Sequence, residues 1–553
     1  MSKIIIYSLL PRLWGNDCLE PKPWGSYEEN GSGKLSDLDE QALAYIRSLG
    51  ATHLWCIGLL EHATATAWPG IPADAPDMVK GIAGSPYALR DYYDIAPSLA
   101  DDVSRRMPEF EALLERVHRS GLKLLIDFIP NHVARSYHSD AHPAGVVDLG
   151  ADDDTTKHFD NQNNFYYFPG EVLHLPQGRI WEESPAKATG NDCFSAYPSQ
   201  NDWYETIKLN YGVDYLGGGH HHFAPIPKTW IRMLEILDFW ASKGVDGFRC
   251  DMAEMVPEAF WSWAIPQLKE RYGADLCFLA EIYQSHRYAS YLHAGFDYLY
   301  DKVGVYDTLR AIMRGECSAS AFDAARDAVA DNQSAMCYFL ENHDEQRIAS
   351  DFFASSPLLG IPALGASLLS GGNPYLLYFG QELGEPGMQA EGFSGVDGRT
   401  TIFDYWSLGC IQRLRADYLG GELTEQERHI LESYQQILAI AQSEPLVSSG
   451  AYYGLNFVQG TGYDTDRCLS YLRYADGAYL LVVANFSHEA RVLTISLPEF
   501  VLEHISLPSN TPLRSEDLRT GACGITTLTP YAPWQLTIEG YGLKFIKLTR
   551  LQD

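Results

Sequence analysis

One short run, residues 245–251, places an arginine two positions before a carboxylate. Residues i and i+2 of an extended strand point to the same side, so Arg249 and Asp251 should project together from a strand end. A guanidinium favours the ionised form of a neighbouring carboxylate and fixes the orientation of its oxygens. The pair therefore suits a nucleophilic carboxylate, although a structural ion pair would produce the same pattern.

Three other apolar runs also end in polar residues that could do chemistry. These residues are Asp127 with Asn131 and His132, then Glu281, and then Asn342, His343 and Asp344. Helix N-caps could explain one or two of these positions, but not four runs in series. Acids gathered from several strand ends would repel one another unless the site uses them or hydrogen-bonds them heavily.

Two carboxylates on either side of a bond are the usual apparatus of glycoside hydrolysis. One attacks the anomeric carbon, and the other protonates the leaving oxygen; a third acid can stabilise the charge that develops on the sugar ring. Tyr87 lies in an aromatic stretch after the second predicted strand, where its ring could stack on a sugar or simply pack in the loop.

Strand-like and helix-like runs alternate through most of the chain. The predicted strands are apolar throughout rather than alternating, which is typical of a parallel sheet covered by helices. About eight strand candidates precede residue 380, enough to close a (β/α)8 barrel. In such a barrel the carboxyl ends of the strands meet on one face, which would gather the acids.

Two segments do not fit the barrel pattern. Residues 133–228 are rich in aromatic residues, Asn and Gly and are too long for a plain loop, so we expect an inserted subdomain after the third strand. Residues 446–553 have short β-rich runs and predict a C-terminal antiparallel β-sandwich. The barrel would then comprise residues 1–132 and 229–445. Within the insertion, 152–154 (three Asp) and 220–222 (three His) read as exposed loops, with a metal site as the alternative.

Composition excludes several classes of protein. The 553 residues carry a formal charge of −31, which argues against binding to nucleic acid or to anionic membranes. The ten cysteines include no C-x-x-C pair, so neither a disulfide scaffold nor a zinc site is indicated. The apolar run at 4–10 is too short to span a membrane and lacks a signal-peptide cleavage site, which favours a cytoplasmic protein.

Taken together, the motifs resemble those of the α-amylase family of glycoside hydrolases. Its four motif regions are matched in order by residues 127–132, 247–251, 279–281 and 339–344, and 378–382 resembles its eighth-strand segment. The resemblance covers residues 1 to about 445. It implies a (β/α)8 barrel with an insertion after strand 3 and a C-terminal sandwich.

The resemblance also implies roles for individual residues. Asp251 would be the nucleophile, Glu281 the acid/base and Asp344 the transition-state stabiliser. The substrate-binding residues would be Tyr87, Asp127, His132, Arg249 and His343.

Some positions depart from the family pattern. Many α-amylases carry Lys-His where this chain has Glu254-Met255, and an aspartate where it has Ala88. Asn131 matches a residue that binds calcium in many members, but the accompanying histidine is absent. We therefore expect that no cofactor is required, with calcium as a possible ligand and the metal site unassigned.

The expected activity is hydrolysis of α-1,4-linked glucose oligosaccharides or glucans with retention, by double displacement. Retention requires the carboxyl groups of Asp251 and Glu281 to lie about 5–5.5 Å apart. Two alternatives remain: a transglycosylase that uses the same residues, and a catalytically silent glucan-binding protein of this fold.

Overall fold

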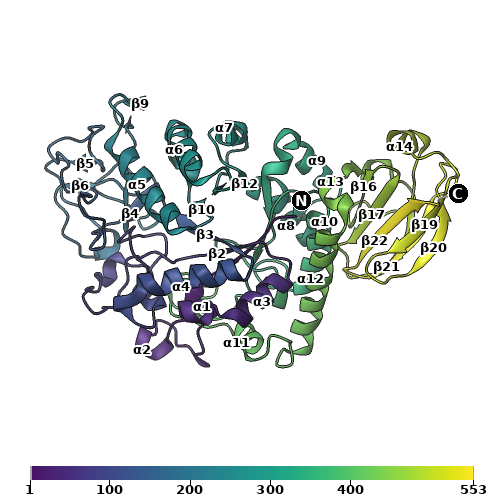
Figure 1. Ribbon diagram of the computed structural model, residues 1–553, viewed down its shortest axis with the longest axis horizontal. Coiled ribbons are helices and arrows are strands. Elements are labelled where there is room, and N and C mark those ends of the chain that lie inside the picture. Colours follow the sequence, from purple (N-terminus) through teal and green to yellow (C-terminus); the bar gives the residue numbers. More distant parts are fainter. Residues whose placement is uncertain (1–2, 552–553) are drawn as a thin grey trace.

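The computed structural model describes residues 3–551, and its central feature is a closed barrel of eight parallel strands (Figure 1). In sequence order the barrel strands are β1 (Ile5–Leu9), β2 (His53–Cys56), β3 (Lys123–Phe128), β10 (Gly247–Cys250), β11 (Cys277–Ala280), β12 (Tyr298–Tyr300), β13 (Met336–Phe339) and β14 (Tyr375–Tyr378). Each pairs with its sequence neighbour, and β14 pairs back onto β1. The predicted (β/α)8 barrel is confirmed.

Helices pack around the outside of the barrel (Figure 1). The longer ones are α3 (Glu40–Ser48), α4 (Arg106–Arg119), α5 (Lys228–Lys243), α6 (Glu258–Tyr272), α8 (Asp307–Arg314), α10 (Gly360–Leu368), α11 (Gly409–Ala416) and α12 (Glu425–Ser443). Helix α5 shows the general logic: Met233, Leu237 and Trp240 repeat at helical spacing and are buried. The helix ends at Gly244, whose φ of 99° is left-handed and therefore suits glycine.

The remaining helices are short connections. They are α1 (Pro11–Trp14), α2 (Tyr27–Asn30), α7 (Tyr288–His293), α9 (Ala321–Asp327), α13 (Pro445–Ser449) and α14 (Glu499–His504). Among residues 3–551, no helix is both long enough and apolar enough to cross a membrane.

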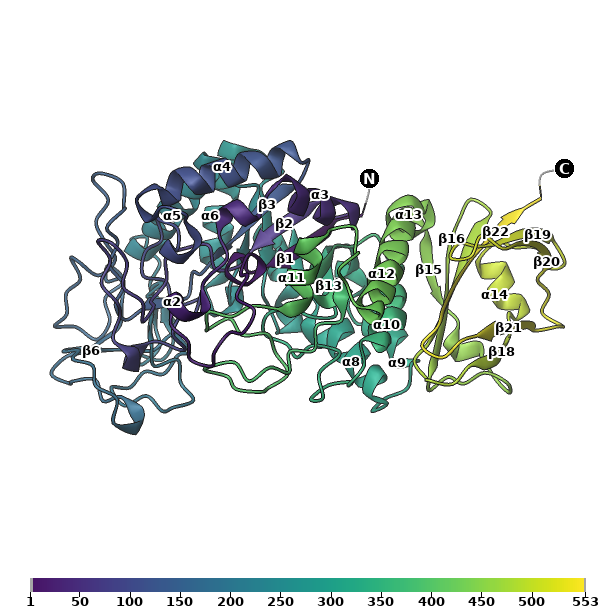
Figure 2. The same ribbon diagram turned by 90° about the horizontal axis from the view of Figure 1, so that it is seen from below.

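The chain between β3 and α5 forms the inserted subdomain, seen at the left of Figures 1 and 2. It contains three two-stranded sheets, which pair β4 (His132–Ala134) with β7 (Thr206–Lys208), β5 (Tyr167–Phe168) with β6 (Ala186–Lys187), and β8 (Val213–Asp214) with β9 (His220–His221). A small separate core around Tyr166, Phe168 and Ala188 supports it. The β4–β7 pair bears most directly on the predicted site, because β4 begins at His132.

The C-terminal part is a β-domain at the end of the molecule away from the insertion (Figures 1 and 2). Six strands form one antiparallel sheet: β15 (Ala451–Gly454), β16 (Cys468–Ala475), β17 (Ala478–Asn485), β19 (Pro512–Asp517), β20 (Cys523–Thr527) and β22 (Leu543–Arg550). A second sheet pairs β18 (Arg491–Ile495) with β21 (Trp534–Ile538). Apolar side chains from both sheets form one core, as in a sandwich. The predicted C-terminal sandwich is confirmed.

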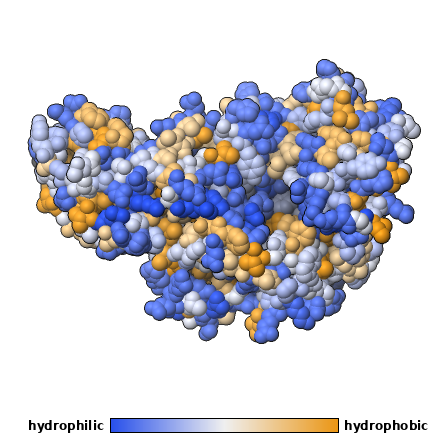
Figure 3. Space-filling view, turned by 180° about the vertical axis from the view of Figure 1, so that it is seen from behind, coloured by the Kyte–Doolittle hydropathy of each residue, from blue (hydrophilic) through white to orange (hydrophobic). Residues whose placement is uncertain are grey.

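On the face shown in Figure 3, hydrophilic residues predominate and hydrophobic ones form scattered patches. Such a surface is normal for a globular domain and indicates no single large docking face on that side.

Candidate active site

Barrel closure places the predicted acids on neighbouring strands. The β3–β10 register sets Asp127 beside Arg249, and the β10–β11 register sets Cys250 beside Ala280. Asp251 and Glu281 therefore follow directly at the ends of adjacent strands, which lie about 4.8 Å apart in a sheet. The ladder continues through them, since the Glu281 N–H donates to the Cys250 carbonyl over 3.1 Å.

The guanidinium of Arg249 binds both of these acids. Its Nη1 lies 2.8 Å from Asp251 Oδ1, and its Nη2 lies 2.7 Å from Glu281 Oε2. Nη1 also lies 3.4 Å from Asp127 Oδ1. The arginine is fully buried, with the rings of Trp55 and Tyr300 packed about it. Arg249 thus fixes three carboxylates around a single cation.

Glu281 is held by two further contacts. The Met252 N–H donates to its Oε2 over 2.8 Å, and the Tyr283 hydroxyl donates to its Oε1. Met252 has a φ of 42°, a left-handed conformation that is unusual for a residue with a side chain. Strain of this kind, directly after Asp251, is typical of functional sites.

Burial and crowding shift the pKa values of the acids. Desolvation raises the pKa of Asp251 well above its ordinary value, Arg249 opposes the shift, and the neighbouring carboxylates add to it. Burial likewise raises the pKa of Asp127 to about 6, although Arg249 and His343 work against the rise. When several carboxyl groups crowd around one cation, the group as a whole tends to retain one proton.

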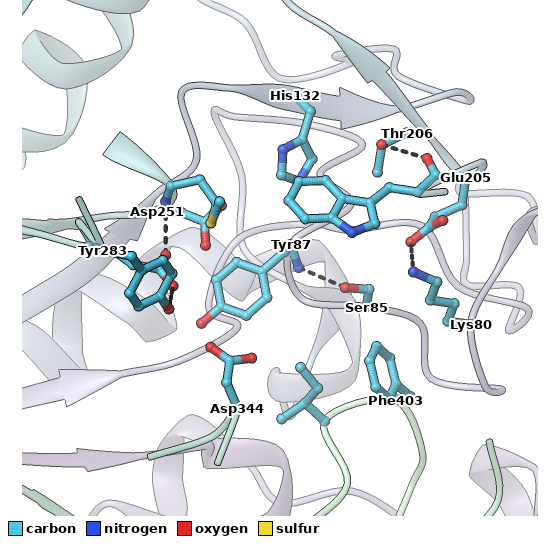
Figure 4. Close-up of a pocket in the computed structure, with 14 residues that line it drawn as sticks. Lys80, Ser85, Tyr87, His132, Glu205, Thr206, Asp251, Tyr283, Asp344 and Phe403 are labelled. Atoms are coloured by element: carbon cyan, nitrogen blue, oxygen red, sulfur yellow. Dashed lines mark hydrogen bonds and ion pairs between the residues drawn. The ribbon is translucent and has the colours of Figure 1, made fainter. Parts of the chain in front are cut away.

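Asp344 belongs to the same pocket but has a different environment. Its side chain is 46% exposed, and its Oδ2 lies 3.1 Å from Nε2 of His343. Desolvation would raise its pKa, but His343, together with the guanidinium groups of Arg249 and Arg399, outweighs that effect and holds the pKa at about 2. The same His343 nitrogen lies 2.7 Å from the Tyr87 hydroxyl, and the two rings are stacked. Asp344, His343 and Tyr87 are therefore connected, and Figure 4 shows Tyr87 and Asp344 side by side in the pocket.

His132 lies on the opposite wall and is buried. Burial and the nearby ammonium groups of Lys208 and Lys80 lower the pKa of His132 to about 3, so its ring is neutral. Trp203 packs against it, with the ring centroids 5.2 Å apart.

A pocket of about 390 Å³ opens between these walls. Five predicted residues line it directly: Tyr87, His132, Asp251, Glu281 and Asp344. Arg249, Asp127 and His343 lie behind that lining. Sequence reasoning missed several lining residues, namely Lys80, Trp203, Glu205, Tyr283 and Phe403. Only Tyr283 left a usable signal, because it lies two positions after Glu281.

The residues around Asn131 do not fit a calcium ion. The ammonium of Lys208 contacts Asn131 Oδ1, lies 2.6 Å from Asp192 Oδ1 and lies 3.3 Å from the Met255 carbonyl oxygen. These are the kinds of oxygen that calcium would use. A lysine that is 2% exposed brings its own positive charge to the position.

Nothing else in the described chain resembles a metal centre. Across residues 3–551, no three His, Cys, Asp or Glu side chains come together as ligands. The histidines at 220–222 are exposed. Asp153 instead accepts hydrogen bonds from the backbone of Asn164 and Phe165, which is a structural role.

Comparison with known proteins gives a consistent result. Residues 21–403 match the family model described as alpha amylase, catalytic domain. Alpha-amylase 3 of Dictyoglomus thermophilum is 24% identical over 449 residues, which cover 77% of each chain. Alpha-amylase MalA of Haloarcula japonica is 25% identical over 462 residues, covering 82% of this chain and 53% of that protein.

Solved structures show the same fold. The crystal structure of the alpha-amylase of Geobacillus thermoleovorans, complexed with acarbose, superimposes with a TM-score of 0.66 at 16% sequence identity. The superposition covers 100% of this chain and 99% of that one.

Proposed function

Because the chain belongs to the α-amylase family of glycoside hydrolases, we propose that it cleaves α-1,4-linked glucose oligosaccharides or glucans with retention of configuration. The observation that carries the proposal is the bridging of Asp251 and Glu281 by one buried guanidinium, at the edge of a pocket of sugar-binding size. Carboxylates bound to neighbouring nitrogens of one group support the short separation that double displacement needs.

In the first step, an oxygen of Asp251 attacks the anomeric carbon and the bond to the leaving oxygen breaks. Glu281 gives its proton to that oxygen, and a glycosyl ester of Asp251 forms. In the second step, Glu281 takes a proton from water, whose oxygen attacks the same carbon and releases Asp251. Two inversions give net retention.

The crowded acids can hold the single proton that this scheme needs, and we assign that proton to Glu281. Three acids around Arg249 can retain one proton between them, as the starting state requires one carboxylate and one carboxylic acid. Asp344, with a pKa of about 2, stays ionised at working pH and can stabilise positive charge on the ring. Tyr87 offers an aromatic face and His132 can hydrogen-bond sugar hydroxyls, while His343 contacts Tyr87 and Asp344 from behind the lining.

We further propose that the enzyme needs no calcium. The Lys208 ammonium supplies, at the Asn131 position, the charge that a cation would bring. The same contacts join the inserted subdomain to the loop after Asp251 through the Met255 carbonyl.

Proton NMR of a fresh reaction with maltoheptaose tests the mechanism. The α-anomer should appear first, before mutarotation; the β-anomer first would contradict double displacement. Chromatography of the same mixture separates the alternatives. Only shorter products mean hydrolysis, products longer than the substrate mean transglycosylation, and binding of acarbose without turnover would mean a silent glucan-binding protein.

A further inference from the structure

An ion pair spans the pocket at the end away from the acids. Lys80, in the loop after β2, places Nζ 2.5 Å from Oε1 of Glu205, which immediately precedes β7 in the inserted subdomain. In Figure 4 the pair lies on the opposite side of the view from Asp251 and Tyr283, with Tyr87 between. Both residues line the pocket.

The backbone holds both partners firmly. The Glu205 carbonyl accepts a hydrogen bond of 3.0 Å from the Arg135 N–H, and Thr206 pairs with Ala134 in the β4–β7 sheet. On the other side, Gly81 has a φ of 70°, and a side chain there would collide with the Phe403 carbonyl. The Ala83 N–H donates to that same carbonyl over 3.1 Å. The pair therefore joins two ordered walls.

Glu205 has bonding capacity that the described residues do not use. Its side chain is 4% exposed, yet within residues 3–551 its Oε2 has no hydrogen-bond partner. A buried carboxylate oxygen without a donor is costly. Lys80 adds an ammonium with three donors, one of which faces Glu205. Adjacent hydroxyls of a glucosyl unit offer the matching donor and acceptor, and Trp203 offers an apolar face beside them.

The chemistry of the proposed reaction fixes which part of the substrate lies there. Glu281 protonates the leaving oxygen, so the leaving group lies on the side of Glu281 and its partner Tyr283. The glycosyl portion retained on Asp251 must extend the other way, towards Lys80 and Glu205. In an α-glucan, that portion ends at the non-reducing terminus.

We propose that Lys80 and Glu205 form an end wall that binds the hydroxyls of the non-reducing terminal glucosyl unit, which makes the enzyme exo-acting. This inference rests on the proposed glycosidase function and specifies its substrate: chain ends rather than internal bonds. The pair connects the loop after β2 to the inserted subdomain, so a continuing glucan chain meets a closed wall where an endo-acting enzyme needs an open cleft.

Two p-nitrophenyl maltoheptaosides test the end wall, one with a free non-reducing end and one with that glucosyl unit blocked as a 4,6-ethylidene acetal. The native enzyme should cleave the free substrate on the order of 100-fold faster, because a site built to bind hydroxyls rejects their loss. Equal cleavage of both would overturn the end wall alone. If neither substrate is cleaved, the glycosidase proposal is contradicted, and the end-wall proposal that rests on it is contradicted as well.

Variants then assign the discrimination to these residues. Glu205→Gln and Lys80→Met should each reduce the free-to-blocked rate ratio by about tenfold or more, mainly through KM for the free substrate. Lys157→Met is the matched control, because Lys157 forms an exposed ion pair with Asp160 in the same subdomain, outside the pocket lining. Thermal midpoints establish that each variant folds. If one of the two pocket variants does not fold, the other is enough to test the proposal. A ratio unchanged from the native value would overturn the proposal.

Discussion

Nη2 of Arg249 lies 2.7 Å from Oε2 of Glu281, and both side chains are buried. The proposed acid is therefore positioned by the same group that positions the proposed nucleophile. A planar guanidinium can bind two carboxylates at fixed angles, whereas an ammonium acts as a point charge. The spacing between Asp251 and Glu281 depends on that planarity.

Replacing Arg249 with lysine should keep the charge but lose the bridge. We expect kcat to fall on the order of 100-fold, because small displacements of catalytic groups have effects of that size. KM should change much less, since Arg249 is buried and does not line the pocket. Steady-state kinetics on maltoheptaose would measure both values, and kcat within about threefold of native would contradict the positioning role.

Asp251→Asn should remove turnover by several orders of magnitude, because an amide cannot form the glycosyl ester. The amide is nearly the same size and relieves carboxylate crowding, so the thermal midpoint should not fall. Calorimetry beside activity assays checks both statements. Near-native turnover in the folded variant would mean that another group is the nucleophile.

The activity of the Glu281→Gln variant should depend on the leaving group of the substrate. A substrate such as an α-glucosyl fluoride needs no proton in its first step, so it should retain far more activity than maltoheptaose does. The measurement is the ratio of the rate with the fluoride to the rate with maltoheptaose, determined for the variant and for the native enzyme. Equal impairment of both substrates would show that Glu281 is not the acid.

Chelation should leave the enzyme unaffected. With the Lys208 ammonium among the oxygens of Asn131, Asp192 and Met255, EDTA should change neither activity nor thermal midpoint. Lys208→Ala, in contrast, should lower the free energy of unfolding by roughly 2–3 kcal/mol. This loss is smaller than that expected for breaking a fully buried ion pair, because Asp192 is partly exposed. Lys157→Ala is the exposed control. A midpoint that drops on chelation of the native protein would show that a metal binds after all.

Glu391, in the segment after β14, should make stability depend on pH. Burial, with nearby Glu385 and Asp404, raises its pKa from 4.5 to about 9. Between those values the folded chain holds a proton that the unfolded chain has lost. The stabilisation is complete below the unfolded value and is lost as pH rises through the folded value, at up to about 1.4 kcal/mol per pH unit.

Glu391→Gln should therefore flatten the decline of the thermal midpoint between pH 5 and pH 9. The thermal midpoints of the native and variant proteins are compared at pH 5, 7 and 8.5. Groups other than Glu391 titrate in both proteins, so their contributions cancel in the difference. Parallel curves for the two proteins would contradict the assignment.

Much of the barrel was predictable because its signals are local. Apolar runs such as 124–126 and the helical spacing in α5 record burial directly in the sequence. The acids at strand ends were predictable for the same reason, since closing any parallel barrel gathers those ends on one face. Their types and order also carried the family resemblance, which the match over residues 21–403 confirms.

The sequence by itself determined which acids could do chemistry and the fold that collects them. Only the tertiary structure decided that one arginine bridges Asp251 and Glu281, and that Lys208 lies at the Asn131 position. It alone brought Lys80 to Glu205 across 125 positions of chain. These contacts join segments that are separated in the sequence, and their geometry depends on how those segments pack after the barrel closes. Local propensity carries no record of such long-range contacts, so they could be found only in the folded molecule.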